Sequence, residues 1–167
     1  MDLPRKMLRG RSFLRIKIRL LLPRHRGYGK IFLSFYAEKA RKGISMGKFV
    51  IRTVNTGIKF DLKATNGQVI LTSEVYTTKA ACQNGVQSIM KNAPAANVED
   101  QTVEGFETMT HPKFEMYQDK AGEYRFRLKA RNGEIIGVSE GYTTKANCVN
   151  GVESVKKNAA DAEIVEA

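Results

Sequence analysis

Two cysteines and two histidines are the residues of this sequence whose types most often serve nucleophilic catalysis or metal binding. Cys82 and Cys148 belong to no C-x-x-C pair, and His25 and His111 lie far apart along the chain. A zinc site needs three or four nitrogen or sulfur ligands. We therefore expect no metal site. The cysteines are expected to be small buried residues, with a disulfide between them as the alternative.

Recognisable enzyme motifs do not occur in the 167 residues. The sequence contains no G-x-S-x-G nucleophile elbow, no P-loop and no G-x-G-x-x-G dinucleotide motif. A pair of carboxylates is the remaining route to catalysis, because any two acidic residues can meet in a fold. We expect a protein with no catalytic residues and no cofactor. Tyr76 and Tyr142 are expected to be packing residues, with hydrogen bonding to a ligand as the alternative.

Basic and apolar residues alternate between Arg125 and Arg131, which is the pattern of a strand with one charged face. A two-residue turn at Asn132-Gly133 would pair Arg131 with Glu134, Lys129 with Ile136, Arg127 with Val138 and Arg125 with Glu140. The same register sets Lys59 against Glu74 in an earlier hairpin. Arg127 and Lys129 are thus expected to lack acidic partners.

This predicted face is the candidate site of the sequence. Our candidates for contact with an anion or a nucleic acid are Arg125, Arg127, Lys129 and Arg131. Sheets that bind single-stranded nucleic acid usually add stacking aromatic rings, whereas the rings of this strand are expected to point to the opposite face. A solvated face is therefore the favoured interpretation.

The elements that position these residues belong to a sequence repeat with an offset of 66 residues. Between Phe60 and Ala93, 22 of 34 positions are identical to those between Phe126 and Ala159. Each copy predicts three strands, a helix and a short last strand. The first and last strands of the two copies are expected at Lys48–Val54, Ala96–Asp100, Lys113–Asp119 and Ala162–Glu166. The body of the chain is therefore a duplicated module.

Each predicted helix follows a threonine pair that can supply its N-cap, Thr77-Thr78 or Thr143-Thr144. One apolar stripe recurs in both helices: Cys82, Val86, Ile89 and Ala93, then Cys148, Val152, Val155 and Ala159. Gly85 and Gly151 lie inside the helices, where glycine costs about 1 kcal/mol relative to alanine. We therefore expect the helices to approach the sheet closely at these glycines.

The pattern NG-x-[VI]-I-x-x-SE-x-YTTKA-x-C-x-NGV-x-S-x-x-KNA occurs twice and resembles the YegP-like family of small bacterial proteins, which are named as a domain of unknown function. The resemblance covers residues 47–167. It implies an α+β fold in which two tandem modules form one antiparallel sheet, with both helices on one face and the C-terminal strands exchanged. It implies no activity.

Positive charge is concentrated at the start of the chain, although the formal net charge is +11. Residues 1–45 contain 13 Lys or Arg against Asp2 and Glu38, whereas residues 46–167 contain 15 charges of each sign. Between Leu14 and Leu20 apolar and basic residues alternate, as in a nucleic-acid arm, a membrane-surface segment or an organelle-targeting segment. The abrupt change in composition favours a different explanation, in which Met46 is the true start.

The predicted organisation is a basic extension over residues 1–45, a module over 46–100, a linker over 101–112 and a module over 113–167. No apolar run is long enough to span a membrane. We expect a cytoplasmic, non-enzymatic structural or interaction protein, a monomer with internal pseudo-twofold symmetry. The sequence identifies no partner, and a protein is the first candidate. The alternative is a nucleic-acid-associated protein that uses the basic arm and the Arg127-Lys129 face, provided that residues 1–45 are genuine.

Overall fold

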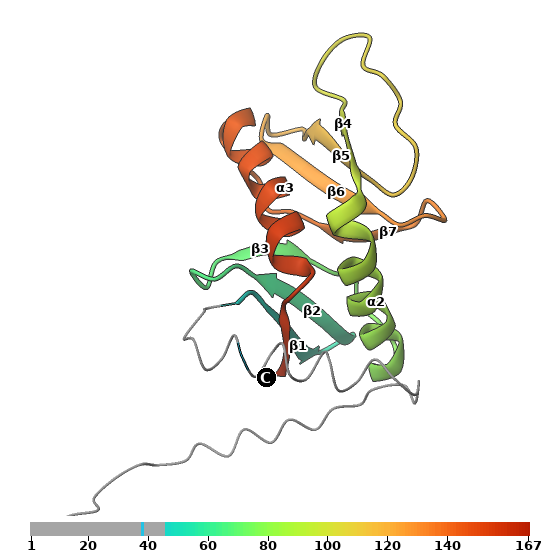
Figure 1. Cartoon of the computed structure of the whole chain (residues 1–167), viewed down its shortest axis with the longest axis vertical. Coiled ribbons are helices and arrows are strands. Elements are labelled where there is room, and N and C mark those ends of the chain that lie inside the picture. The colour runs from blue at the N-terminus through green and yellow to red at the C-terminus, as the bar shows by residue number, and fades with distance from the viewer. Residues whose placement is uncertain (1–37, 39–45) are drawn as a thin grey trace, which may run out of the picture. The chain divides into compact units, whose positions relative to one another are not determined.

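The computed structural model describes Glu38 and residues 46–167, so the arm predicted over residues 1–45 otherwise lies outside the described residues. Residues 46–167 form one compact unit (Figure 1). Its elements are β1 (Lys48–Val54), β2 (Gly57–Lys63), β3 (Val69–Thr72), α2 (Lys79–Asn92), the 3-10 turn η1 (Ala93–Ala95), β4 (Asn97–Asp100), β5 (Lys113–Gln118), β6 (Tyr124–Lys129), β7 (Ile135–Val138), α3 (Lys145–Ala159) and β8 (Glu163–Glu166). The predicted α+β module therefore occurs twice.

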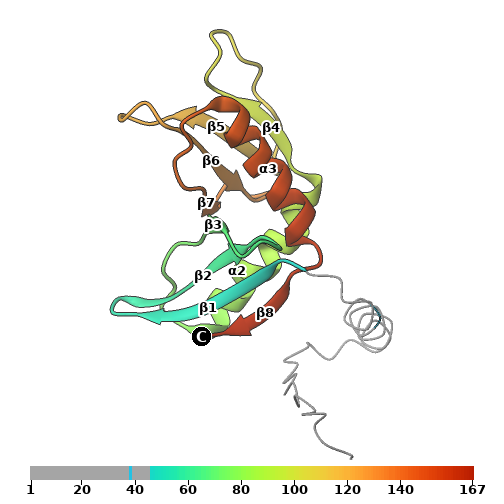
Figure 2. The same cartoon turned by 90° about the vertical axis from the view of Figure 1, so that its left-hand side faces the viewer.

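One sheet contains all eight strands in the order β4-β5-β6-β7-β3-β2-β1-β8. At its centre β3 meets β7, where Thr72 is the partner of Val138. These residues are equivalent in the repeat, so an approximate twofold axis passes between them. At the edges, β4 of the first module pairs with β5 of the second, and β8 of the second pairs with β1 of the first (Figure 2).

The prediction of a purely antiparallel sheet is wrong at both of these edges. The pairs β4 with β5 and β8 with β1 are parallel, so the sheet is mixed. The reason is the connection between β4 and β5: residues 101–112 carry the chain back along the sheet, so β5 runs in the same direction as β4. By the symmetry of the repeat, β8 runs in the same direction as β1. Parallel neighbours need such crossover connections, whereas the hairpins inside each module do not.

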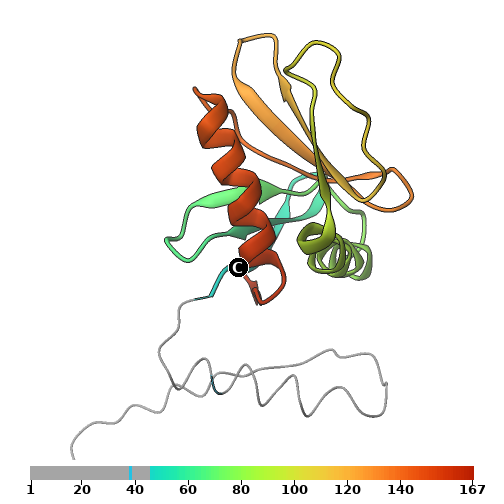
Figure 3. The same cartoon turned by 45° about the horizontal axis from the view of Figure 1, so that its top comes forward.

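Both helices pack on the same face of the sheet, as predicted (Figure 3). The core between the helices and the sheet contains the edge-to-face ring pairs Phe49 with Phe60 and Phe114 with Phe126. A Cβ atom on Gly85 would clash with the hydroxyl of Tyr76 and would lie 3.2 Å from the ring of Phe60 on β2, which confirms the close approach of helix and sheet. Thr78 and Thr144 are the N-caps, accepting hydrogen bonds from backbone N–H groups of the first turn. No helix in the described part of the chain is long and apolar enough to cross a bilayer.

The hairpin turn between β6 and β7 differs from the predicted two-residue turn. The N–H of Gly133 donates to the carbonyl of Ala130, and the N–H of Ala130 donates to the carbonyl of Glu134. The loop therefore contains three residues, 131–133, with Gly133 in the left-handed region at φ +83. Asn-Gly is compatible with both loop lengths, which is why the sequence alone misassigned the turn.

The extra loop residue shifts the register near the turn. Lys129 lies opposite Ile135 instead of Ile136, and the shift occurs between Leu128 and Lys129. Beyond the shift the prediction is correct, because Arg127 lies opposite Val138. Ile136 is consequently buried, and Ile135 is the exposed isoleucine of β7.

Candidate functional site

The sheet face opposite the helices, which we call the open face, carries the candidate basic residues of β6. Phe126 and Leu128 point into the core, so Arg125, Arg127 and Lys129, which alternate with them, lie on the open face. Arg131 lies in the hairpin loop and is exposed. The structure thus brings three of the four candidates onto one face and leaves the fourth at the turn.

Arg127 and Lys129 have acidic partners, contrary to the prediction. Glu115 on the neighbouring strand β5 accepts from Arg127 Nε at 2.5 Å on one carboxylate oxygen. Its other oxygen lies 2.9 Å from Lys129 Nζ and 3.1 Å from Lys113 Nζ. The Arg127 guanidinium also lies 5.2 Å from the ring centroid of Tyr117. This side of β6 is therefore part of a charge network that includes carboxylates.

A second carboxylate extends the network onto β4. Glu99 Oε2 accepts hydrogen bonds from Lys113 Nζ at 2.6 Å and from the backbone N–H of Met109 at 2.7 Å. Glu99 Oε1 accepts from the side-chain amide of Gln101 at 2.7 Å. Glu99, Lys113 and Glu115 are only 2, 5 and 2% exposed. Such burial is tolerated because each of these charges has opposite charges or hydrogen-bond donors and acceptors around it.

The cover over this network is a consequence of topology. Because β4 and β5 are adjacent and parallel, residues 101–112 must cross one face of the sheet to join them. The hydrogen bond from Met109 to Glu99 shows that the crossing closes over the open face. The sequence analysis did not predict Glu99 and Glu115 as partners of the basic residues, because it considered only the hairpin of β6 and β7. The alternation of Lys113 and Glu115 in a predicted strand was the signal that charged side chains share one face of β5.

The pKa values in the network favour its charged state. Burial alone would raise the pKa of Glu115, but hydrogen bonds from Lys129, Arg127 and Lys113 outweigh burial and lower it to about 2. Burial opposes the charge of Glu99 and Lys113 as well. Their mutual hydrogen bond nevertheless contributes to a lowered pKa for Glu99 and a raised pKa for Lys113. The carboxylates are therefore anions, and the lysine is a cation, over the whole physiological pH range.

Arg125 binds two acids of its own hairpin instead of the predicted Glu140. Arg125 Nε donates to Asp119 at 2.6 Å, and its Nη2 lies 3.1 Å from Glu123. The hydrogen bond from Arg125 is the main cause of the lowered pKa of Asp119. Glu140 and its equivalent Glu74 are exposed and form no ion pair within the described residues. The predicted recurrent cross-strand ion pairs are therefore wrong.

The thiols and the two recurrent tyrosines belong to the core. Cys82 and Cys148 are free and fully buried, and burial raises the pKa of Cys148 to about 11. The ring of Tyr76 stacks on Phe60 at 6.2 Å, and that of Tyr142 stacks on Phe126 at the same distance. The prediction of buried thiols is confirmed, and the tyrosines pack as expected.

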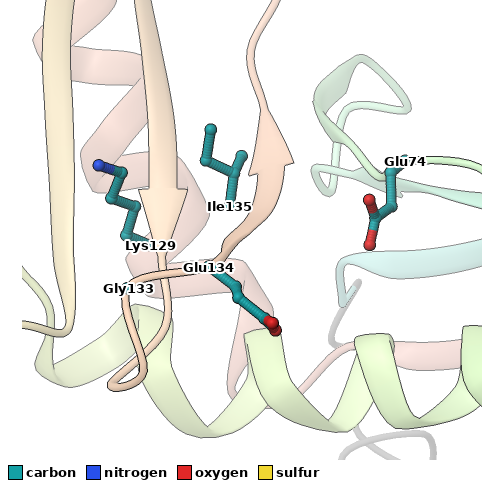
Figure 4. A pocket seen from close by; sticks show the side chains of 5 residues that line it. All are labelled: Glu74, Lys129, Gly133, Glu134 and Ile135. Atoms are coloured by element: carbon teal, nitrogen blue, oxygen red, sulfur yellow. The ribbon is translucent and has the colours of Figure 1, made fainter.

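A hollow of about 520 Å³ lies beside the network, lined by Glu74, Lys129, Gly133, Glu134 and Ile135. Figure 4 shows that Lys129 and Ile135 extend from adjacent strands, whereas Glu74 comes from the segment after β3. The hollow has few apolar walls, and Lys129 is already bound to Glu115. Among the described residues no group of three or more His, Cys, Asp or Glu side chains is arranged to hold a metal ion.

The duplicated module and its sheet match proteins that are already known. The model of the family described as "Domain of unknown function (DUF1508)" matches residues 55–100 and 119–166, one match in each copy. The chain belongs to this family. The resemblance to YegP-like proteins and the presence of two tandem copies are thereby confirmed, and the family description names no activity.

The chain is similar to some proteins over both of its modules and to others over a length of about one module. The UPF0339 protein YegP of Yersinia pestis is 34% identical over 116 residues, which are 69% of this chain and 90% of that protein. A UPF0339 protein of Stutzerimonas stutzeri, encoded in the 5′ region of the ptx operon, is 39% identical over 121 residues, 72% of this chain and 96% of that protein. A UPF0339 protein of Treponema denticola is 61% identical over 54 residues, which are 32% of this chain but 93% of that protein.

Solved structures agree with the fold. The solution NMR structure of the protein of unknown function yegP from E. coli is 31% identical and covers 74% of this chain and 94% of its own, with a TM-score of 0.61. That of the UPF0339 protein SO3888 from Shewanella oneidensis is 33% identical and covers 72% and 90%, with a TM-score of 0.58. These likenesses establish the α+β architecture of the family and carry no information on activity.

Proposed function

We propose that the protein is a non-enzymatic interaction unit made of two fused modules, acting in the cytoplasm. The observation that supports this proposal is that the buried charges are already ion-paired, and the pKa shifts agree with it. Hydrogen bonds and ion pairs outweigh burial, so they lower the pKa of Glu99, Asp100, Glu115 and Asp119 and raise the pKa of Lys113 and Arg125. Burial raises the pKa of both cysteines and both stacked tyrosines. Every one of these shifts moves a pKa further from pH 7.

Catalysis by proton transfer requires the opposite arrangement. A general acid or base works best when its pKa lies near the operating pH, and active sites tune buried groups toward that value. The buried carboxylates here are held as anions by Lys113, Lys129 and Arg127, which is the behaviour of structural ion pairs. The raised pKa of the cysteines likewise disfavours the thiolate that a nucleophile needs.

Replacement of Glu115 by glutamine tests the structural role of the network. We expect Glu115→Gln to lower the free energy of unfolding, measured by urea denaturation, because an amide cannot balance three cations. Glu153→Gln, on the exposed face of α3, is the matched control and should change stability by less than about 0.5 kcal/mol. Catalytic groups are often held at a cost in stability, so their removal tends to stabilise a protein. A Glu115→Gln variant as stable as the wild type, or more stable, would overturn the proposal.

The nucleic-acid role of Arg125, Arg127, Lys129 and Arg131 stays a prediction, with less support than the sequence suggested. Three of these residues have carboxylate partners that a phosphate would have to displace. Charges over residues 46–167 also balance, so this part of the chain provides no general attraction for phosphates. Binding through this face would therefore be weak.

A further inference from the structure

The crossing segment between β4 and β5 is held firmly at both ends. At its start, the N–H and hydroxyl of Thr102 donate to Asp100 at 3.1 and 2.6 Å. Near its end, the N–H of Met109 donates to Glu99, and the side-chain amide of Asn97 donates to the carbonyl of Thr110 at 3.0 Å. The segment therefore leaves the sheet and returns to it at fixed points, and it projects as the loop at the top of Figure 1.

The tip of this loop exposes apolar side chains. Val103 and Phe106 are 49 and 43% exposed, whereas the other four phenylalanines of the described residues are fully buried. Gly105, between them, has φ +71 and forms the turn of the tip. A phenylalanine gains about 1.5–3 kcal/mol when it is fully buried. The loop thus presents a partly exposed aromatic side chain on a base fixed by hydrogen bonds.

Carboxylates flank these apolar residues. Glu104 and Glu107 are exposed, and neither forms an ion pair within the part of the chain that the structure describes. An aromatic side chain that enters a pocket is a common centre of a protein interface, and charges around it select a partner of opposite sign. Acidic residues beside the apolar tip disfavour phosphate groups and anionic lipids.

We propose that the loop tip Val103–Glu107 is a docking site for a protein partner that has an apolar pocket with Lys or Arg at its rim. Phe106 fills the pocket, Val103 adds apolar contact, and Glu104 and Glu107 bind the basic rim. The proposal rests on the proposed function, because it names the partner chemistry of an interaction unit. The ion network over β4 and β5 supports the site by fixing the end of the loop at Glu99.

Photo-crosslinking in the cells that produce the full chain tests this proposal. A photoreactive phenylalanine analogue is placed at Phe106, at Val138 on the open face, or at Val149 on α3, since all three side chains are exposed. We expect a discrete protein adduct from Phe106 and none from Val149. Adducts only from Val138 or Val149 would overturn the loop site while retaining an interaction role. No adduct at any position would overturn both proposals.

The chemical identity of the molecule crosslinked to Phe106 distinguishes the proposed protein partner from other binding partners. A nucleic acid, a lipid or a second copy of this chain in the adduct would overturn the proposed partner. If the adduct is another protein, that protein is purified and its affinity for the full chain is measured. We expect Phe106→Ser to weaken binding by about tenfold or more, as for an interface hot spot, with an unchanged melting temperature.

The role of Glu104 and Glu107 is tested with the full chain and the same purified partner protein. Glu104→Gln with Glu107→Gln should slow association and make binding less sensitive to salt, because steering charges act mainly on the association rate. Val149→Ser is the control and should bind like the wild type. Wild-type affinity of the Phe106→Ser variant, or unchanged salt dependence of the double variant, would contradict the site.

Discussion

The two halves of the open face, one formed by β4–β7 and the other by β8 with β1–β3, have the same strand register but different chemistry. In the half formed by β4–β7, Glu99 is the partner of Glu115 across β4 and β5. The equivalent pair in the other half is Val165 with Val50 across β8 and β1. That half has a smaller polar group, in which Asp61 accepts from Arg52 Nε and from the Thr72 hydroxyl, both at 2.8 Å.

The difference coincides with the crossing loop. Residues 101–112 cover the charged pair Glu99 and Glu115, whereas Val50 and Val165 are partly exposed. The equivalent strand pairs therefore form with two valines at one edge of the sheet and with two carboxylates at the other. A buried ion network contributes little more to stability than apolar residues of similar size, because desolvation offsets most of the attraction. We infer that the charges serve to hold the loop rather than to hold the sheet.

The largest effect on stability is expected when one carboxylate of the network is removed and the buried lysine is retained. Glu115→Val leaves Lys113 buried with one of its two carboxylate partners, and it should lower the free energy of unfolding by about 3 kcal/mol. The triple variant Glu99→Val, Lys113→Met and Glu115→Val introduces the valine pair found at the other edge of the sheet and also removes the buried lysine, so it should recover most of that loss. Urea denaturation measures both.

Val50→Glu is the matched control in the first module. Because this position is partly exposed, the new carboxylate should cost less than about 1 kcal/mol, mainly through repulsion from its strand partner Asp61. If the triple variant were less stable than Glu115→Val, the network would be essential to the sheet, and the contrast between the modules would be misread.

Local patterns allowed much of the fold to be predicted. The apolar stripe with Cys82 and Val86, the N-cap at Thr78 and the close approach at Gly85 each depend on residues near one another in the chain or on direct repetition. The register near Lys129 could not be predicted, because Asn-Gly suits hairpin loops of two and of three residues. The partners of Arg127 and Lys129 were missed because Glu115 lies on a different hairpin strand, and its cover depends on a parallel pairing that no local pattern shows.

Lowering the pH should reduce the free energy of unfolding by an intermediate amount. The pKa of Glu115 is lowered from its ordinary value to about 2, so its contribution is complete above about pH 4.5 and is lost as the pH falls from 4.5 to 2. A shift of this size corresponds to about 3 kcal/mol at most. Urea midpoints between pH 7 and pH 2 should therefore fall more steeply for the wild type than for the triple variant. Both proteins retain Asp100 and Asp119, whose pKa values are also lowered, so parallel curves would refute the assignment to Glu115.

The smallest effect concerns an ion pair that occurs in both halves. Lys145 at the start of α3 lies 2.5 Å from Asp100 on β4, and the equivalent Lys79 on α2 lies 2.6 Å from Glu166 on β8. Each pair joins the last strand of one module to the helix of the other. Lys79 and Glu166 are about half exposed, so Lys79→Ala should cost less than about 0.5 kcal/mol.

Lys145→Ala should cost more than Lys79→Ala, up to about 1 kcal/mol. Asp100 is less exposed than Glu166, and Thr102 also donates hydrogen bonds to it. Lys145 opposes the effect of burial on Asp100 and contributes to its lowered pKa. A double-mutant cycle of Lys145→Ala with Asp100→Asn isolates the interaction by urea denaturation, and a cycle of Lys79→Ala with Glu166→Gln isolates that of the equivalent pair. Asp100 stands at the start of the loop 101–112, so a larger coupling energy in the Lys79 pair would mean that this loop does not shield the Lys145 pair from solvent.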